Sequence, residues 1–354
     1  MTCGSREPMV RSTAGRPFHH FIRLHGFASM RALARRLTLI VVAAAVGTAC
    51  VEGALRLAGF SFRTYPSVQF GWPEPTNIRD LFDPDRDLFW VTHDYFAQLE
   101  TARRMHPAIV FMGDSCTQFG SYPTMTLTRL DSRDPSLATG VKVGVAGWSS
   151  EQGLTQLQRD IIPLHPRIVT VYFGWNDHWV ALGRPDADAH ATAAGFWLSQ
   201  HVRTWQLLTK AWLSVSPPLA GRPERVGVDQ YVANLERMVR LANAADIQVV
   251  LITAPANHRR GHEPEYLAHR HVRRLDDLVP LHQRYVAATR RAAGETGAVL
   301  CDAAAAFEAD PARVSYFEVD GIHLKMPGNR AMADLLAPCI LRAAAQPIVR
   351  TARQ

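Results

Sequence analysis

One serine, one asparagine and an aspartate–histidine pair stand at positions in this sequence where they could act together on an ester or an amide. Ser115 follows the apolar run 109–112, Asn176 follows a later apolar run, and Asp320 and His323 lie three residues apart near the C-terminus. A histidine that an aspartate orients can take the proton of a serine hydroxyl, whose oxygen then attacks a carbonyl carbon. These residue types indicate nucleophilic catalysis by serine.

Each of these features also has an ordinary structural explanation. A serine at a strand-to-helix turn often caps the helix, and an asparagine at the end of a strand is common in turns. An Asp-x-x-His spacing arises easily by chance in a chain with 15 histidines. The serine does not stand in the G-x-S-x-G elbow of the α/β-hydrolases, because Thr117 occupies the place of the last glycine. The chemistry therefore depends on whether the fold brings the four side chains together.

Short apolar runs alternate with helix-like stretches after about residue 107. The apolar runs, which we expect to be strands, are Ala108–Met112, Val141–Ala146, Ile168–Phe173, Ile247–Thr253 and Ala298–Cys301. The spacing predicts helices at Glu151–Ile162, Val228–Ala244, Val279–Thr296 and Gly328–Ala345. This alternation predicts an α/β fold, a three-layer α/β/α sandwich with a central parallel sheet of about five strands. Ligands bind outside the carboxyl ends of such strands, and the candidate residues lie at those ends.

In this order and context the chain resembles the SGNH, or GDSL-like, hydrolase family. Four segments carry the resemblance: Gly113-Asp114-Ser115, Gly147 to Leu154, Gly174-Trp175-Asn176-Asp177 and Asp320-Gly321-Ile322-His323. The second segment departs from the family's pattern, because Lys142 stands where an asparagine is often found, and this leaves the conformation of that loop open. The resemblance implies a flavodoxin-like fold and a serine esterase or acylhydrolase that needs no cofactor and no metal.

The resemblance also implies a role for each residue. Ser115 is expected to be the nucleophile, His323 its general base, and Asp320 the carboxylate that orients the histidine. The backbone N–H groups of Ser115 and Gly147 and the side-chain amide of Asn176 are expected to form the oxyanion hole.

Other residues near these segments are expected to support the site. Asp114 is expected to fix the nucleophile loop through backbone hydrogen bonds, and Asp177 to do the same, with Gly174 beside it. Cys116 is expected to be a buried thiol, although a second nucleophile is the alternative. Asp302 ends the last predicted strand and is expected to be structural.

Aromatic and basic residues flank the predicted site. Four of them form a possible substrate wall that could stack on a sugar ring or an acyl chain, although packing of a nearby insertion explains them equally well: Trp148, Trp175, His178 and Trp179. A basic cluster follows the fourth predicted strand: His258, Arg259, Arg260, His262, His269 and His271. We expect a solvated basic loop that borders the site, and the alternatives are a metal site or a preference for anionic substrates.

The N-terminus carries a separate signal. Residues 1–36 hold seven arginines and one acid, so they account for six of the seven net positive charges and are expected to be a basic tail. Residues 1–29 have no apolar period and are expected to have no fold. The nearly neutral remainder excludes an electrostatic footprint for nucleic acid. Residues 37–57 carry no charged side chain except Glu52 and Arg56, and as a helix they would measure about 32 Å. We therefore expect a transmembrane signal-anchor helix at 37–59 with the rest of the chain extracytoplasmic, either periplasmic or at the cell surface.

Other interpretations of this segment stay open. The small residues Gly47 to Ala49 could serve a signal peptidase, and the protein would then be secreted. Cys50 could end a lipoprotein signal, although Gly47 stands where leucine or valine is usual. The segment could also be a buried core helix. Translation could begin at Met1 or at Met30.

The rest of the chain is expected to divide into three parts. These are a lead-in segment at 60–106, a hydrolase domain at 107–345 and a C-terminal tail at 346–354. An insertion at 178–227 contains the helical stretch Phe196–Leu213 and is expected to form a cap or lateral wall. The five scattered cysteines form neither a disulfide framework nor a metal-binding spacing.

These features together lead to one expected function and several alternatives. We expect hydrolysis of an O-acetyl or other short acyl ester on a cell-envelope or secreted glycan, through an acyl-serine intermediate. The substrate could instead be a lipid, as for a lysophospholipase, or a small ester. The same residues could transfer the acyl group to a glycan, or the fold could serve a non-catalytic envelope protein. The expected contacts are an ester substrate and a membrane through the N-terminal helix, without nucleic acid.

Overall fold

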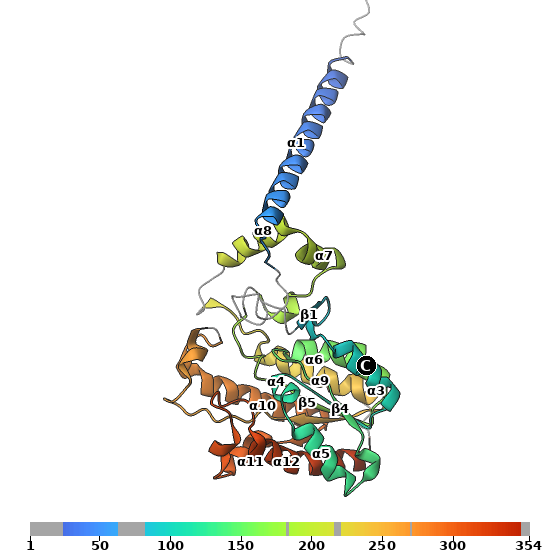
Figure 1. Cartoon of the computed structure of the whole chain (residues 1–354), viewed down its shortest axis with the longest axis vertical. Helices are drawn as coiled ribbons and strands as arrows, with labels where there is room; N and C mark the ends of the chain where they lie inside the picture. The colour runs from blue at the N-terminus through green and yellow to red at the C-terminus, as the bar shows by residue number, and fades with distance from the viewer. Residues whose placement is uncertain (1–23, 63–81, 182–183, 216–220, 270, 348–354) are drawn as a thin grey trace, which may run out of the picture. The chain divides into compact units, whose positions relative to one another are not determined.

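The chain forms two compact units, Met1–Phe60 and Ser61–Gln354. The computed structural model (Figure 1) describes residues 24–62, 82–181, 184–215, 221–269 and 271–347. Most of the predicted N-terminal and C-terminal tails therefore lies outside the described residues. All the residues assigned to catalysis by the resemblance belong to the second unit.

The first unit is built on one long helix, α1 (Leu24–Leu57). Its segment Ala32–Leu57 has a mean hydropathy of 1.9, and none of its most apolar window is buried. By length and composition it is a candidate membrane span, and a signal sequence would have the same properties. The absence of burial does not fit the core-helix interpretation. The expectation that residues 1–29 have no fold is wrong for residues 24–29, because the helix-favouring leucine, alanine and arginine of residues 30–36 extend α1 backward to Leu24.

The second unit is built on a parallel five-stranded sheet in the order β4-β3-β5-β6-β7. Its strands are β3 (Ile109–Gly113), β4 (Gly140–Lys142), β5 (Ile168–Tyr172), β6 (Gln248–Ile252) and β7 (Val299–Cys301). This order is that of the flavodoxin-like folds, and it reverses direction between β3 and β5. Every residue of β3 and of β5 is buried, since helices cover both faces of the sheet.

Two hydrophobic cores fill the space between the sheet and its helices. Alternate residues of β3 face opposite sides, with Val110 and Met112 in one core and Ile109 and Phe111 in the other. The first core is completed by α6 (Ser150–Gln156), α9 (Val228–Ala244) and α10 (Leu278–Thr296). The second is completed by α5 (Tyr122–Asp131), α11 (Ala303–Ala309) and α12 (Met326–Ala345). The predicted three-layer sandwich is confirmed.

The lead-in segment belongs to the first core. It contains the antiparallel hairpin of β1 (Phe82–Asp85) and β2 (Phe89–Thr92), followed by α3 (Tyr95–Met105). Trp90 is fully buried, and its Nε1 donates a 2.9 Å hydrogen bond to the carbonyl oxygen of Ala146. The hairpin therefore supports the loop after β4.

The insertion forms two helices, α7 (Ala193–His201) and α8 (Arg203–Ser214). The extended backbone of Val202 separates them, where the sequence predicted one helical stretch. The two ends of the insertion are joined by a bridge between Val180 and Glu224 and by a 2.9 Å hydrogen bond from the N–H of Val226 to the carbonyl oxygen of Asp177. The insertion is thus anchored at the carboxyl end of β5.

Two predicted elements are shorter than expected. β4 ends at Lys142, and the chain beyond it remains extended through hydrogen bonds from the N–H groups of Val143 and Val145 to β3. The helix predicted over 151–162 is regular only to Gln156 and continues as a π-helical segment, Leu157–Ile161, before a 3₁₀ turn that contains Pro163. Proline cannot donate the next helical hydrogen bond, so the helix ends there.

Candidate active site

The carboxyl end of β3 presents Ser115 at the start of the short helix α4 (Ser115–Gln118). Its Oγ lies 2.9 Å from Nε2 of His323, although 208 residues separate the two in the chain. Nδ1 of His323 lies 2.6 Å from Oδ2 of Asp320. With the proton on Nδ1 donated to Asp320, Nε2 is free to accept the hydrogen of Ser115. The fold therefore brings these three residues into a continuous hydrogen-bonded chain.

The loop between η8 (Arg313–Tyr316) and α12 fixes the carboxylate of Asp320. Its Oδ1 accepts hydrogen bonds from the backbone N–H groups of Ile322, at 2.8 Å, and His323, at 2.9 Å. Burial opposes ionisation of Asp320, but the hydrogen bond from His323 and these N–H groups outweigh it and hold its pKa below the usual value. Burial likewise disfavours the charged imidazole, yet Asp320 raises the pKa of His323 above its usual value.

Three candidate hydrogen-bond donors come from the loops that follow β3, β4 and β5. The N–H of Ser115 is at the first position of α4, where no helical acceptor exists. Gly147 has φ of +81°, a conformation that favours glycine, and within the described residues its N–H meets no acceptor. The side chain of Asn176 comes from the loop after β5, the strand beside β3. These donors lie at the edge where the sheet order reverses, and they are of the kind that binds an oxyanion.

Asp114 connects the nucleophile loop to Asn176. It is buried, and its two oxygens accept hydrogen bonds from the N–H of Cys116, at 2.9 Å, and from Nδ2 of Asn176, at 3.0 Å. Burial raises the pKa of Asp114 to about 6. Burial also raises the pKa of the Cys116 thiol well above its usual value, so this cysteine stays protonated at neutral pH and is a poor nucleophile.

Asp177 supports different loops from those expected. Its oxygens accept hydrogen bonds from the N–H groups of Ser150, at 2.8 Å, and Gly174, at 3.0 Å. Asp177 therefore does not bind the nucleophile loop as expected, and instead it joins the start of α6 to the loop after β5. Burial raises its pKa to about 7.

The loop after β4 is tied to the nucleophile loop by polar side chains. Oε1 of Gln118 accepts a 2.6 Å hydrogen bond from the N–H of Ala146. Lys142, the departure from the family's pattern, donates from Nζ to the carbonyl oxygens of Gln118, at 2.8 Å, and Gly120, at 3.1 Å. The lysine thus holds the chain just after α4.

A buried ion pair from the insertion supports Gly147, and the sequence alone did not reveal it. Arg225 and Asp186 are almost fully buried and approach to 2.6 Å. Nη1 of Arg225 donates a 2.6 Å hydrogen bond to the carbonyl oxygen of Gly147, and Asp186 accepts one from Oγ of Ser149 at 2.8 Å. An arginine and an aspartate 39 residues apart carry no motif, so only the fold identifies them.

The four residues of the possible aromatic wall do not face solvent. Trp148, Trp175, His178 and Trp179 are all buried. Nε1 of Trp148 donates to the carbonyl oxygen of Trp90 at 2.9 Å. These side chains pack the insertion and the lead-in onto the domain, which was the alternative explanation.

His258, from the basic cluster, contacts the loop that carries Asp320. Its Nε2 lies 2.7 Å from the carbonyl oxygen of Asp320, and a Cβ on Gly321 would come within 2.7 Å of its ring. The ring also packs edge-on against Trp175, next to Asn176. Burial lowers the pKa of His258, so the neutral ring donates Nε2–H to Asp320. This histidine links the acid loop to the loop of the amide donor.

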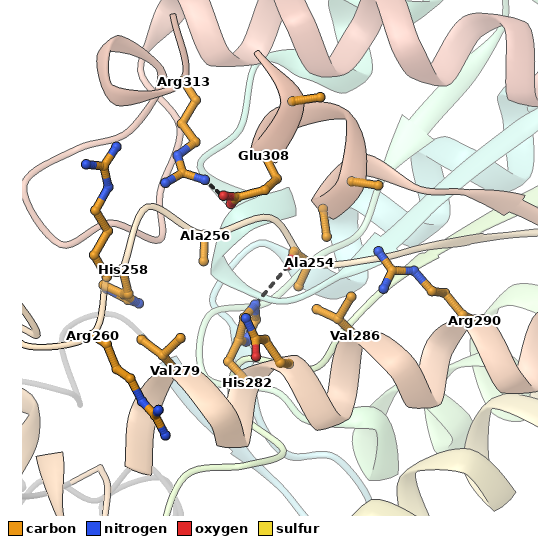
Figure 2. A pocket seen from close by; sticks show the side chains of 15 residues that line it. Ala254, Ala256, His258, Arg260, Val279, His282, Val286, Arg290, Glu308 and Arg313 are labelled. Carbon is orange, nitrogen blue, oxygen red and sulfur yellow. Dashed lines mark hydrogen bonds and ion pairs between the residues drawn. The ribbon is translucent and has the colours of Figure 1, made fainter. Parts of the chain in front are cut away.

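A cavity of about 1050 Å³ lies beside His258 (Figure 2), in the range of ligand pockets. Its walls come from the loop after β6, from α10 and from α11, and Ser115 does not line it. Four arginines line it: Arg259, Arg260, Arg290 and Arg313. Arg290 pairs with Asp302 and Arg313 with Glu308. Arg259 and Arg260 form no ion pair with any described residue, and His262 is exposed.

The structure also bears on the remaining cluster residues and on metals. The ring of His271 packs on Trp179 with 5.0 Å between the ring centroids, and the side chain of His269 lies outside the described part. Across the described residues, no three histidine, cysteine, aspartate or glutamate side chains gather as metal ligands do. Asp302 caps α11 and accepts a hydrogen bond from Thr253, a structural arrangement.

Comparison with solved structures finds matches of low sequence identity. A lipase/acylhydrolase from Enterococcus faecalis is 17% identical, with 66% of this chain and 95% of that chain covered and a TM-score of 0.44. A GDSL-like lipase from Bacteroides thetaiotaomicron is 17% identical, with 71% and 97% covered and a TM-score of 0.42. A variant of an acetyl-xylooligosaccharide esterase from Geobacillus is 17% identical, with 69% and 96% covered and a TM-score of 0.41.

A search of curated proteins finds no match. A sequence model of the GDSL-like lipase/acylhydrolase family, in contrast, matches residues 111–331, which is more than half of the chain. The matched segment runs from β3 into α12 and so contains every residue of the hydrogen-bonded chain that links Ser115, His323 and Asp320. The protein therefore belongs to the GDSL-like lipase/acylhydrolase family and is a hydrolase that acts on ester bonds.

Proposed function

We propose that this hydrolase removes a short acyl group, such as O-acetyl, from a glycan outside the cytoplasm, with Ser115 as its nucleophile. The observation that carries the proposal is the chain of hydrogen bonds from Ser115 through His323 to Asp320, at 2.9 and 2.6 Å. These distances lie within the reach required of a nucleophile, its base and the group that orients the base.

Acylation of the serine proceeds directly from this geometry. Oγ of Ser115 forms a bond to the ester carbonyl carbon while its proton passes to Nε2 of His323. The carbonyl oxygen becomes an oxyanion that the N–H groups of Ser115 and Gly147 and the amide of Asn176 stabilise, at about 3 kcal/mol for each donor. The bond to the alcohol oxygen then breaks, and His323 returns the proton to that oxygen. The product is an acyl-serine and a free hydroxyl on the glycan.

Water completes the turnover by the same steps in reverse order. His323 takes a proton from a water molecule, whose oxygen bonds to the acyl carbon. The Oγ–acyl bond of the intermediate breaks, and the proton passes back to Ser115. The acid leaves, and the enzyme returns to its starting state.

The exposure of the site supports a bulky substrate with a small acyl group. The side chains of His323 and Asp320 are 31% and 25% exposed. Phe119 is largely exposed with its ring 6.0 Å from that of His323, so it stands at the rim of the site. A polymer can reach a base that lies this near the surface, whereas a long acyl chain needs an apolar channel.

The arginine cavity supports an anionic group on the substrate. Arg259 and Arg260 lack carboxylate partners among the described residues, and the cavity adjoins the Asp320 loop through His258. Burial and the nearby Arg259 lower the pKa of Arg313, which itself pairs with Glu308. A carboxylate or phosphate on a glycan would satisfy these guanidinium groups.

The proposed location rests on α1. We propose that α1 stays in the membrane as an uncleaved anchor, with the basic residues before it on the cytoplasmic side and the hydrolase domain outside. The length and hydropathy of Ala32–Leu57 support this. Cleavage of the segment as a signal peptide is the competing outcome, and the mass of the mature protein distinguishes the two.

Turnover of p-nitrophenyl acetate, butyrate and octanoate by the full chain, beside the Ser115→Ala variant, tests the proposal. We expect serine-dependent release of p-nitrophenol that is fastest with acetate. Acetylated glycans with and without carboxylate groups come next, with released acetate as the readout. Equal rates for the wild type and a folded Ser115→Ala variant would refute the serine esterase, and faster turnover of octanoate would redirect the proposal to lipids.

A further inference from the structure

Helix α8 turns an apolar face toward solvent. Its exposed large side chains are Trp205, Leu208 and Trp212, with Val215 just after the helix, at 43%, 62%, 53% and 79% exposure. The spacing of three, four and three residues places all four along one side of the helix. Tryptophans and leucines this exposed and contiguous indicate an interaction surface, which we call the α8 face.

The opposite side of α8, which contacts the protein, is polar. Gln206 is buried, and its Nε2 donates a 2.9 Å hydrogen bond to the carbonyl oxygen of Ser199. Helices at a protein surface normally bury their apolar side and expose their polar side. In α8 this arrangement is reversed, so packing on its own domain does not explain the tryptophans.

The neighbouring helix adds a further exposed tryptophan. Trp197 on α7 is 55% exposed and stacks on His201 with ring centroids 5.0 Å apart. The cations of α8 lie on its other side with Gln206, where Nζ of Lys210 is 5.7 Å from the centroid of the Phe62 ring. Tryptophan is enriched where a protein meets the headgroup region of a membrane.

The chain itself limits how far α8 can be from the end of α1. Within the second unit, Nη1 of Arg203 donates to Oγ of Ser61 at 2.9 Å, and the N–H of Phe62 donates to Oε1 of Gln206 at 2.9 Å. Only four peptide steps connect Leu57, the last residue of α1, to Ser61. Four residues reach at most about 14 Å.

We propose that α8 is an interfacial helix whose face, Trp205, Leu208, Trp212 and Val215 with Trp197 of α7, inserts into the outer leaflet of the lipid bilayer. The inference rests on the proposed anchoring of the chain by α1. An anchored α1 ends at the membrane surface, and the short link then keeps α8 within reach of the headgroups. A second copy of the chain would have to find the face by diffusion, whereas the bilayer is already there.

Contact of α8 with the membrane would fix the orientation of the active site, because α8 belongs to the insertion that supports Gly147. The insertion contains Arg225, which donates to the carbonyl oxygen of Gly147, and Asp186, which pairs with Arg225. A helix fixed in the interface would restrict rotation of the domain about the link at residues 58–61. The enzyme would then present its catalytic edge at a constant distance from the lipid surface.

Quenching of a fluorescent label by lipids tests this in the full chain. Cys3 and Cys50 are replaced by serine and alanine, while the buried Cys116, Cys301 and Cys339 remain. A bimane label is attached at Leu208→Cys, at Val314→Cys as a control of similar exposure, 58%, or at Val41→Cys in α1. The protein is placed in nanodiscs of phosphatidylcholine and phosphatidylglycerol with nitroxide lipids labelled at a shallow or deep acyl position.

We expect shallow nitroxides to quench the label at Leu208→Cys at least about threefold more than the label at Val314→Cys, since an interfacial helix lies about 5–10 Å into the boundary region. Deep nitroxides should quench Val41→Cys. If the labels at positions 208 and 314 are quenched equally while the label at position 41 is quenched, the α8 proposal is wrong and the proposed anchor stands. If no nitroxide lipid quenches the label at position 41, both the proposed anchor and the α8 proposal are wrong. A label at position 208 that is shielded from the nitroxides only when two copies share a nanodisc overturns the α8 proposal in favour of a dimer.

Discussion

Asn176 and Asp114 are joined by a hydrogen bond of 3.0 Å from Nδ2 to Oδ2, so the residue before the nucleophile aims the amide that would bind the oxyanion. Asp114 is buried and accepts a second hydrogen bond from the N–H of Cys116. One carboxylate thus sets the relative position of the proposed nucleophile and the proposed oxyanion donor, which follow adjacent strands.

This relationship predicts the effect of Asp114→Asn. The new amide can still accept from Cys116, but its NH₂ group would face the NH₂ group of Asn176, and two donors cannot bond. We expect kcat to fall by about 10²–10³, as for loss of one oxyanion donor, with little change in KM. Steady-state kinetics with p-nitrophenyl acetate measure both.

A double-mutant comparison separates this from general damage. Adding Asp114→Asn to Asn176→Ala should cost little more than Asn176→Ala alone, because both act through the same amide. Asp302→Asn, which alters another cap aspartate away from Ser115, should leave turnover within about twofold. Fully additive losses would show that Asp114 acts independently of Asn176.

The pH dependence of kcat/KM should report His323. Only the neutral imidazole can accept the proton of Ser115, and Asp320 raises the pKa of His323 above its usual value of 6.5. Activity should therefore rise with pH, with a midpoint above 6.5, and be lost as the pH falls through it. Asp320→Asn removes the raising influence, so the midpoint should shift downward while kcat falls by about 10³–10⁴. An unchanged midpoint in this variant would contradict the assignment of Asp320.

The buried pair of Arg225 and Asp186 should matter for stability and for turnover. Arg225→Met leaves the Asp186 carboxylate buried without its partner, and we expect the free energy of unfolding to fall by about 3–5 kcal/mol. Arg240→Met breaks an exposed pair with Glu236 and should change it by less than about 1 kcal/mol. Urea denaturation of the full chain in detergent measures both.

The same variant should also slow the reaction, because Arg225 holds the carbonyl of Gly147. We expect kcat of folded Arg225→Met to fall about ten- to a hundredfold, as a misplaced donor would cause, and the Arg225→Met, Asp186→Asn double variant to regain stability but not kcat. Full activity in either variant would show that the pair supports the fold alone.

Arg259 and Arg260 should affect the KM of anionic substrates only. Replacing both with serine removes the two guanidinium groups that lack carboxylate partners in the described part of the chain. KM for an acetylated glycan that bears carboxylates should rise about tenfold or more, and KM for p-nitrophenyl acetate should not change. Equal effects on both substrates would assign these arginines to structure.

The sequence predicts the sheet and its layers through periodic patterns, and it predicts candidate site residues through their positions at the ends of strands. Alternating apolar runs and helices such as Val228–Ala244 reflect burial on one side, so the sheet and its layers can be inferred from periodicity. Ser115, Asn176 and His323 stand directly beside such elements, and the fold places Ser115 and His323 in contact. The sequence did not predict where individual helices begin and end when the local backbone conformation departs from the hydrophobic pattern. At Val202 the extended backbone divides the predicted helical stretch of the insertion into two helices.

The sequence could not predict contacts that depend on chains folding back from a distance. Trp148 and His178 look like a substrate wall because they flank donor residues, yet the lead-in and the insertion cover them. Arg225 and Asp186 have no local pattern, since their pairing depends on the path of the insertion between them. Burial by a distant segment and pairing across an insertion leave no periodic pattern in the sequence.

The pair of Arg225 and Asp186 makes the insertion difficult to exchange. Loops that decorate a rigid scaffold are usually the parts in which evolution or an engineer changes specificity freely. Here the inserted segment also holds Gly147, the proposed oxyanion donor, through Arg225. A segment grafted from another esterase would therefore have to supply its own substitute for both side chains of the pair. Variation in this enzyme should therefore concentrate in α7 and α8, between the two fixed residues, rather than at the ends of the segment.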